Sequence, residues 1–184
     1  MGDTATTPVR SAAADCPKLA PLIAYLDSLT GRADLATLHR LLSKAGITRA
    51  DIESSCIFGT RGYKRNTIAR SDHYELLALT WRSGHCTPIH DHRQSSCAFR
   101  VVEGTGTEIR FKVTPSGLVC PVATHEMTPG YICAAEEADI HQVANMQGAD
   151  QDLITLHIYS PPIQCMQTYK FATSDGAECA ANYQ

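Results

Sequence analysis

The order of apolar and polar residues divides the chain into a helical first third and a β-rich remainder. Between Lys18 and Leu29 the apolar residues recur at nearly helical spacing, which predicts a helix. Asp34 is a suitable N-cap for a second helix, and Gly46 is a suitable end. The apolar stripe of this second helix consists of Leu35, Leu38, Leu41 and Leu42. Thr48 can cap a further short turn that runs through Ile52, so we expect helices over about residues 18–53.

After Phe58, short segments rich in β-forming residues follow one another. Turn signals separate them at Glu103-Gly104, Pro115-Ser116-Gly117 and Pro129-Gly130. The expected strands are Tyr74–Trp81, Ala98–Val102, Thr107–Val113, Gly130–Ala134, His141–Asn145, Asp152–Ser160 and Gln167–Phe171. Many short strands at such intervals are typical of a β-sandwich or a small barrel, here over about residues 57–172.

The length of 184 residues fits one domain of ordinary size, and no break separates the helices from the strands. Residues 1–15 are rich in Ala, Thr and Asp, and we expect them to form a flexible N-terminus. Residues 16–184 are then expected to form a single domain that contains both the helices and the barrel.

Composition and charge narrow the function classes. The 16 Lys and Arg residues against 19 Asp and Glu residues give a net charge of −3, which argues against a nucleic-acid-binding face. No run of 18 apolar residues predicts a membrane span, and Met1–Ala14 has no apolar signal region. The eight cysteines are scattered singly, which favours free thiols in a reducing compartment. We therefore expect a cytoplasmic protein, and a monomer.

The most informative polar motif is Ile89-His90-Asp91-His92. In an extended strand, side chains two residues apart share a face, so both histidines can reach one transition-metal ion. Taken alone, such a pair is more often solvated or part of a core than a metal site. Gly84 stands six residues before His90, Gly104 stands twelve after His92, and His141 is followed four residues later by Asn145.

This two-part spacing resembles the cupin pattern, with Cys97 where cupins usually have a glutamate. The resemblance implies a mainly β fold: a small double-sheet barrel, or jelly roll, behind an N-terminal helical segment, with the metal inside. A site of His90, His92 and His141 consists of neutral imidazoles, so a divalent metal there keeps its full charge and favours an anionic ligand such as a thiolate. Three protein ligands also leave positions open.

A second constellation is the alternating segment Asp152–Tyr159. Leu153, Thr155, His157 and Tyr159 share one face of the predicted strand. Inside a barrel, this polar face needs hydrogen-bond partners, and the alternative is that solvent covers it. The following Ser160-Pro161-Pro162 ends the strand and permits a cis peptide bond.

Together the motifs resemble those of the cysteine dioxygenases, thiol dioxygenases of the cupin superfamily, over about residues 58–165. The resemblance rests on Tyr63-Lys64-Arg65-Asn66, Gly84-His85, Ile89-His90-Asp91-His92, Ser96-Cys97, His141-x3-Asn145 and Leu156-His157-Ile158-Tyr159-Ser160-Pro161-Pro162. It implies that L-cysteine is oxidised by O2 to cysteine sulfinate at a non-haem Fe(II) centre.

The resemblance also implies a role for each matching residue. His90, His92 and His141 match the iron ligands. Arg65 matches the arginine that binds the substrate carboxylate, and Tyr63 matches a tyrosine of the pocket. Cys97 and Tyr159 match a thioether-linked pair beside the iron. His157 matches a histidine that hydrogen-bonds this tyrosine, and Thr155 stands where relatives usually have a serine.

Other functions are open at this point. A dioxygenase for another small thiol, such as 3-mercaptopropionate, is the nearest alternative. Relatives with that preference typically lack the arginine and the crosslinking cysteine that Arg65 and Cys97 match. A non-catalytic metal-binding cupin is the other, with Cys97 closing a four-coordinate zinc site. Cys86 and Cys165 receive no role. The remaining histidines are expected at the surface: His39, His73 and His125.

Overall fold

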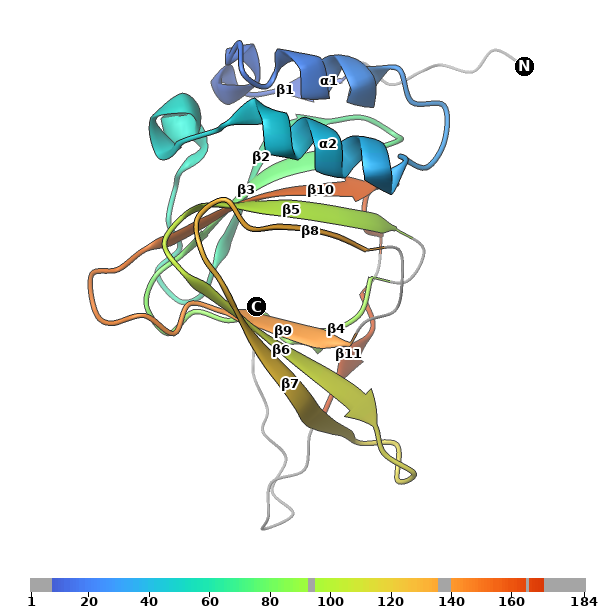
Figure 1. The fold of residues 1–184 in the computed structure, drawn as a ribbon, viewed down its shortest axis with the longest axis vertical. Coiled ribbons are helices and arrows are strands. Elements are labelled where there is room, and N and C mark those ends of the chain that lie inside the picture. The colour runs from blue at the N-terminus through green and yellow to red at the C-terminus, as the bar shows by residue number, and fades with distance from the viewer. Residues whose placement is uncertain (1–7, 93–94, 136–139, 165, 171–184) are drawn as a thin grey trace.

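The computed structural model describes residues 8–92, 95–135, 140–164 and 166–170, which form two facing antiparallel sheets with helices over one of them (Figure 1). The six-stranded sheet has the order β1 (Val9–Arg10), β2 (Lys64–Arg70), β3 (Glu75–Trp81), β10 (Leu153–Ser160), β5 (Ser96–Glu103), β8 (Ile132–Ala135). The five-stranded sheet has the order β11 (Thr168–Tyr169), β4 (Ile89–His90), β9 (His141–Ala144), β6 (Gly106–Val113), β7 (Val119–Met127). The expectation of a mainly β, double-sheet fold behind N-terminal helices is confirmed.

The helices follow the caps that the sequence contains. The chain forms η1 (Ala12–Asp15), α1 (Ala20–Asp27), α2 (Leu35–Ala45) and η2 (Arg49–Ser55). The Asp34 carboxylate accepts the backbone N–H of Thr37 and so caps α2, as expected. Gly46 ends α2 with a φ of 54°, a left-handed conformation that favours glycine. The segment 1–15, expected to be flexible, includes β1 and η1, while residues 1–7 lie outside the described residues.

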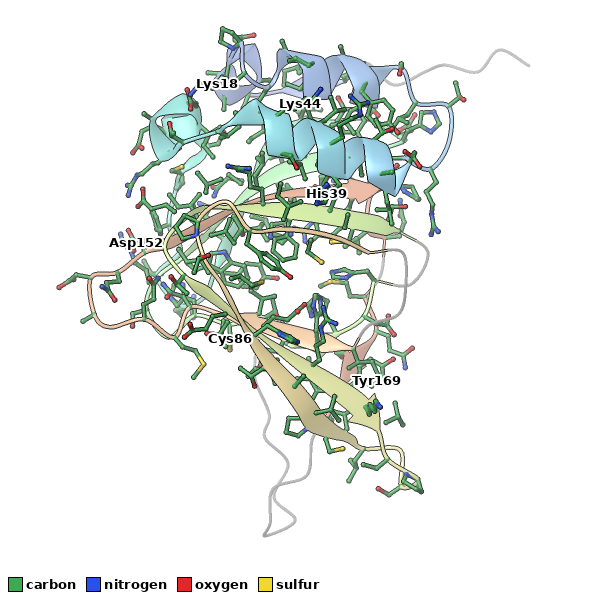
Figure 2. All side chains as sticks on the ribbon, viewed as in Figure 1. Lys18, His39, Lys44, Cys86, Asp152 and Tyr169 are labelled. Carbon is green, nitrogen blue, oxygen red and sulfur yellow. The ribbon has the colours of Figure 1, made fainter. Side chains whose placement is uncertain are left out.

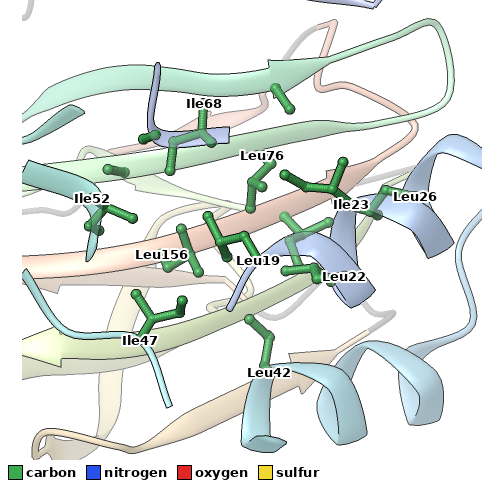
Figure 3. Packing of buried hydrophobic residues seen from close by; sticks show 14 of the residues in the cluster. Leu19, Leu22, Ile23, Leu26, Leu42, Ile47, Ile52, Ile68, Leu76 and Leu156 are labelled. Carbon is green, nitrogen blue, oxygen red and sulfur yellow. The ribbon is translucent and has the colours of Figure 1, made fainter. Parts of the chain in front are cut away.

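The helices pack on the outer face of the six-stranded sheet. Figure 3 shows Leu19, Leu22 and Leu26 of the first helical layer directed toward strand residues. Leu76 and Leu156, which they meet there, are completely buried. Burial of such a layer is the main source of stability, because each fully buried Leu or Ile contributes about 1.5–3 kcal/mol. The helices therefore fix the back of this sheet and leave its other face to the barrel interior.

Strand β10 shows how one sequence serves both faces. Ile154, Leu156 and Ile158 belong to the core beneath the helices. The residues that alternate with them face the barrel interior and are 0–5% exposed: Leu153, Thr155, His157 and Tyr159. The alternative that solvent covers this polar face is therefore wrong. The interior side chains fill the space between the two sheets (Figure 2).

All seven expected strands are present with shifted ends, but four strands were not predicted: β1, β2, β4 and β7. Strand β2 is rich in charged residues and alternates imperfectly, since a bulge interrupts its pairing with β3 between Thr67 and Ala69. Strand β7 contains Pro121, which is tolerated because β7 is an edge strand and Pro121 lies next to a bulge of β7 at Val122. Phe171, the expected end of the last strand, lies outside the described residues.

Two local expectations have clear outcomes. The Ser160–Pro161 peptide bond is cis. Within residues 8–92, 95–135, 140–164 and 166–170, no helix has the length and hydropathy needed to span a membrane.

Candidate metal centre

Three histidines converge inside the barrel. His90 ends β4 and pairs in register with His141, the first residue of β9, while His92 follows two residues after His90. Their candidate ligand atoms all lie within 4.8 Å of one another, and the Nε2 atoms of His90 and His92 are 3.1 Å apart. The side chains of the His-x-His pair share a site as expected, although only His90 belongs to a strand.

Hydrogen bonds orient two of the rings. Nδ1–H of His90 donates to the carbonyl oxygen of Pro88 at 2.9 Å, because a carbonyl can only accept. Nδ1 of His141 lies 2.8 Å from Oε1 of Glu108, whose other oxygen accepts from Arg110 at 3.0 Å. Each of these bonds turns an Nε2 lone pair toward the common centre. Nε2 of His141 is buried without a hydrogen-bond partner, which is the expected state of a metal-ligand atom.

The barrel interior keeps His90 and His92 uncharged. Burial, together with the neighbouring imidazoles, lowers the pKa of His90 to about 4 and the pKa of His92 to about 2. Burial by itself raises the pKa of Glu108, but the hydrogen bonds from His141 and Arg110 outweigh it and hold that pKa below its usual value. At neutral pH His90 and His92 therefore offer imidazole lone pairs, and the ionised Glu108 carboxylate lies beside the ring of His141. This donor set fits a first-row transition metal.

Cys97 lies near this group without joining it. Among the described residues, the candidate ligand group contains the three histidines and no thiol. Burial raises the pKa of the Cys97 thiol, which keeps it protonated. The alternative of a zinc site closed by Cys97 thus has no support in this geometry. Instead, Cys97 on β5 lies directly opposite Tyr159 on β10 in the strand register.

A pocket of about 370 Å³, including its part open to solvent, adjoins the histidines. Its lining brings together the expected site residues Tyr63, Arg65, His90, His92, Cys97, His141, His157 and Tyr159. Apolar residues complete it, among them Leu79, Phe99 and Val143. The structure thus collects residues from β2 to β10 at one place, as the resemblance predicts.

The wall opposite the histidines carries the positive charge. The guanidinium carbon of Arg65 lies 5.4 Å from the centre of the Tyr159 ring, and Nη2 donates to Glu75 at 2.8 Å. Tyr63 stacks on Trp81 with ring centres 4.5 Å apart. Arg65 is therefore held beside Tyr159, and its side chain lines the pocket.

A chain of hydrogen bonds leads from Trp81 to the pocket. The Trp81 indole N–H donates to Oγ1 of Thr155 at 3.1 Å. Oγ1 of Thr155 is 2.9 Å from Nε2 of His157, and Nδ1 of His157 is 3.2 Å from the Tyr159 hydroxyl oxygen. Because the buried Thr155 proton has His157 Nε2 as its acceptor, Nδ1 of His157 carries the ring proton and donates to Tyr159. The phenol proton of Tyr159 is then available to the pocket.

Burial fixes the protonation states along this chain. It lowers the pKa of His157 well below its usual value and raises the pKa of Tyr159 well above its usual value. Both groups are neutral at physiological pH, so the chain acts through hydrogen bonds rather than through charge.

Among the residues that sequence reasoning missed are Glu75, Trp81 and Glu108, whose side chains hydrogen-bond Arg65, Thr155 and His141. Each belongs to a predicted strand, but period-two alternation shows only which face a residue shares, not its cross-strand partner. That a buried carboxylate lies beside a histidine of the neighbouring strand can be recognised only when the pairing register of the two strands is known.

The cysteines and histidines to which the sequence assigned no role lie outside the pocket lining or outside the described residues. Cys86 forms an isolated bridge with Ala144 and is not among the pocket-lining residues. Cys165 lies outside the described residues. The histidines expected at the surface are exposed, as predicted: His39, His73 and His125.

The fold and the histidine group define a double-stranded β-helix protein of the cupin type with a candidate metal centre. A solved protein of Klebsiella pneumoniae, described as an uncharacterized conserved protein with a double-stranded β-helix domain, has the same fold. It matches with a TM-score of 0.53 and 11% identity over 64% of this chain and 87% of its own. A likeness at this identity shows the fold alone.

A family model described as cysteine dioxygenase type I matches residues 9–172, and the chain therefore belongs to that family. It is 28% identical to cysteine dioxygenase type 1 of Danio rerio over 114 residues, and 26% identical to that of Homo sapiens over 113 residues. Each alignment covers 58% of this chain and 55% of the relative, so the chain spans about half the length of the curated relatives it matches.

We predict that Glu108→Gln weakens metal binding roughly tenfold to hundredfold, because a neutral amide makes the His141 ring a poorer ligand. Competition with a chromophoric chelator measures the affinity. Glu126→Gln on the exposed face of β7 is the matched control and should leave it unchanged. Equal affinities in the two variants would contradict a supporting role for Glu108.

Proposed function

We propose that this protein is a thiol dioxygenase that converts L-cysteine and O2 to cysteine sulfinate with Fe(II) as its metal. The observation that carries the proposal is the meeting, in one pocket, of three histidines, an arginine and a buried tyrosine. Family membership supports it. The overall reaction is balanced, since RSH and O2 together contain the atoms of RSO2H, and no further reductant is needed.

His90, His92 and His141 would hold the metal through their Nε2 atoms. When bound, ferrous iron would supply a position for the substrate thiolate and the ability to activate O2. The protein's own contribution is to present neutral ligands, which leave the metal charge available to an anion. The apolar lining residues Leu79, Phe99 and Val143 restrict water at the same place.

Arg65 would bind the substrate carboxylate. Its guanidinium projects over the Tyr159 ring and lines the same pocket as the histidines. A guanidinium is permanently charged and can pair with a carboxylate through two parallel hydrogen bonds, so it fixes orientation as well as affinity. The substrate would thus be held between this clamp and the histidine group.

Tyr159 would donate a hydrogen bond to the reacting groups. His157 hydrogen-bonds the phenol oxygen of Tyr159. The hydrogen bonds of Thr155 to His157 and to Trp81 favour one tautomer of the His157 ring. A preorganised donor of this kind stabilises developing negative charge without having to reorient during the reaction. Tyr63 would pack along the same wall through its stacking on Trp81.

Cys97 and Tyr159 would form a thioether. Directly opposite residues of an antiparallel pair have Cβ atoms about 4.5–5.5 Å apart, close enough for a sulfur to reach the neighbouring ring. Formation of the bond removes one hydrogen from the thiol and one from the ring, and O2 accepts the two hydrogens and two electrons to become hydrogen peroxide. The link would fix the phenol in the position that the hydrogen bonds already favour.

The central test is the product formed from L-cysteine under isotopically labelled O2. We expect cysteine sulfinate in which both sulfinate oxygens are labelled, identified by mass. His90→Ala should lose metal and product while circular dichroism shows a retained fold, because the apolar faces supply the core. A product with fewer labelled oxygens, or bound zinc without O2 uptake, would contradict the proposal.

Arg65→Gln should raise the KM for L-cysteine by roughly thirtyfold, from the loss of about 2 kcal/mol of charge-assisted hydrogen bonding. Steady-state O2 uptake measures it. Arg82→Gln, which loses an exposed pair with Asp152, is the matched control. A parent enzyme that prefers 3-mercaptopropionate to cysteine would make the substrate assignment wrong while keeping the reaction class.

Cys97→Ser should abolish the thioether and retain part of the activity, because the hydrogen bonds still position Tyr159. Intact mass distinguishes the two forms, since the linked protein is lighter by two hydrogen atoms. A small change in gel mobility should accompany the link. If the parent, after turnover, has the mass of the unlinked chain, the crosslink proposal is wrong.

A further inference from the structure

Asp91 is a buried carboxylate between two of the candidate metal ligands. It stands between His90 and His92 in the chain, and its side chain is completely buried. Successive side chains of an extended segment point to opposite sides, so the Asp91 side chain is directed away from the histidine pair. On that side the hydroxyl of Tyr169 donates to Oδ2 of Asp91 at 2.6 Å. This hydrogen bond therefore holds residues 90–92 from the side opposite the metal centre.

The strand register explains why Tyr169 reaches Asp91. Strand β11 pairs with β4 so that Tyr169 lies directly opposite Ile89. Paired residues share a face of the sheet, and Asp91 follows two residues after Ile89 on that face. The backbone makes a second connection, because the N–H of Asp91 donates to the carbonyl oxygen of Gln167 at 3.2 Å. One short segment thus holds Asp91 through both its side chain and its backbone.

Residues 166–170 also reach two other parts of the molecule. Met166 lines the pocket that contains the histidines. At the other end, the carbonyl oxygen of Lys170 accepts from the backbone N–H of Val119, the first residue of β7, at 3.3 Å. Strand β11 has only two residues and forms an edge of the five-stranded sheet, where Figure 2 labels Tyr169. A short edge strand opens locally with little free energy, so each further bond to it has a large effect.

We propose that Tyr169 is a positioning residue of the metal centre, which acts through Asp91 to keep His90 and His92 at the spacing that a metal ion requires. The inference rests on the proposed function only as far as it needs a metal at the three histidines. The hydrogen bonds described above turn individual rings, whereas this bond fixes the backbone between two rings. Because coupling between two sites is reciprocal, bound metal in turn holds residues 166–170 in place.

The test is titration of the metal-free protein with Co²⁺, monitored by visible absorption, which reports both affinity and ligand geometry. Tyr169→Phe removes the hydroxyl and keeps the ring and the backbone pairing of β11. We expect the Kd for Co²⁺ to rise about tenfold, the lower end of the range for groups that orient metal ligands, and the absorption bands to shift.

Tyr74→Phe is the matched control. The Tyr74 hydroxyl likewise donates to an aspartate, Asp27, at 2.7 Å, but neither residue belongs to the pocket lining. Loss of this bond should lower the stability of the fold and leave both the Kd for Co²⁺ and the absorption bands unchanged. The comparison separates a positioning role from a merely structural one.

A double-variant cycle shows whether Tyr169 acts through Asp91. Asp91→Ala removes the acceptor, so the addition of Tyr169→Phe to this variant should raise the Kd for Co²⁺ no further. If the two substitutions raise the Kd independently, so that their effects multiply, the route through Asp91 is wrong.

Hydrogen exchange of the unmodified protein decides the question if the variants do not fold. Co²⁺ should slow amide exchange in the peptide that contains residues 166–170, because the metal reduces local opening there. The peptide that contains β1, a two-residue edge strand of the other sheet, is the control and should exchange at the same rate with and without Co²⁺.

The outcomes separate this proposal from the proposed function. An unchanged Kd in folded Tyr169→Phe, or equal exchange of residues 166–170 with and without Co²⁺, overturns the role of Tyr169 even when the iron-loaded protein oxidises cysteine. If both measurements show the expected effect but the iron-loaded protein oxidises no thiol, the proposed function is overturned and the role of Tyr169 stands.

Discussion

Three imidazoles brought to one point inside an apolar barrel are the constraint on which the rest of the structure depends. Charged rings at this spacing would repel one another and would lose hydration, so burial lowers the pKa of His90 and His92. The lone pairs of His90 and His141 are aimed by hydrogen bonds that the far side of each ring makes to Pro88 and Glu108. Neutrality and orientation together produce a site that a metal cation can satisfy.

The barrel supports this site because each face of its central strand has a different neighbour. On one face β10 meets the helices through Ile154, Leu156 and Ile158. On the other face, Thr155, His157 and Tyr159 form a chain of hydrogen bonds within the buried interior. The apolar layer anchors the strand, and the anchored strand holds the polar groups in the fixed positions that chemistry requires.

Two buried carboxylates distribute charge around the pocket. Glu108 accepts from a histidine and from Arg110, whereas Glu75 accepts from Arg65 and Arg70. Each carboxylate is paired with an arginine at its outer side, and this ion pair offsets the desolvation free energy of burying the charge. One carboxylate thus contacts a histidine of the candidate metal centre, and the other contacts the arginine that lines the pocket.

The sequence by itself determined what depends on local pattern: the capped helix from Asp34 to Gly46, the alternation of β10, and the shared site of His90 and His92. These follow from periods of 3.6 and two residues and from side-chain capping, which act over a few neighbours. Only the tertiary structure decided whether the Thr155 face is buried or solvated, and which carboxylates stand behind His141 and Arg65. Those contacts join β3 to β2 and β6 to β9, and pairing between distant strands is set by register and packing of the whole barrel.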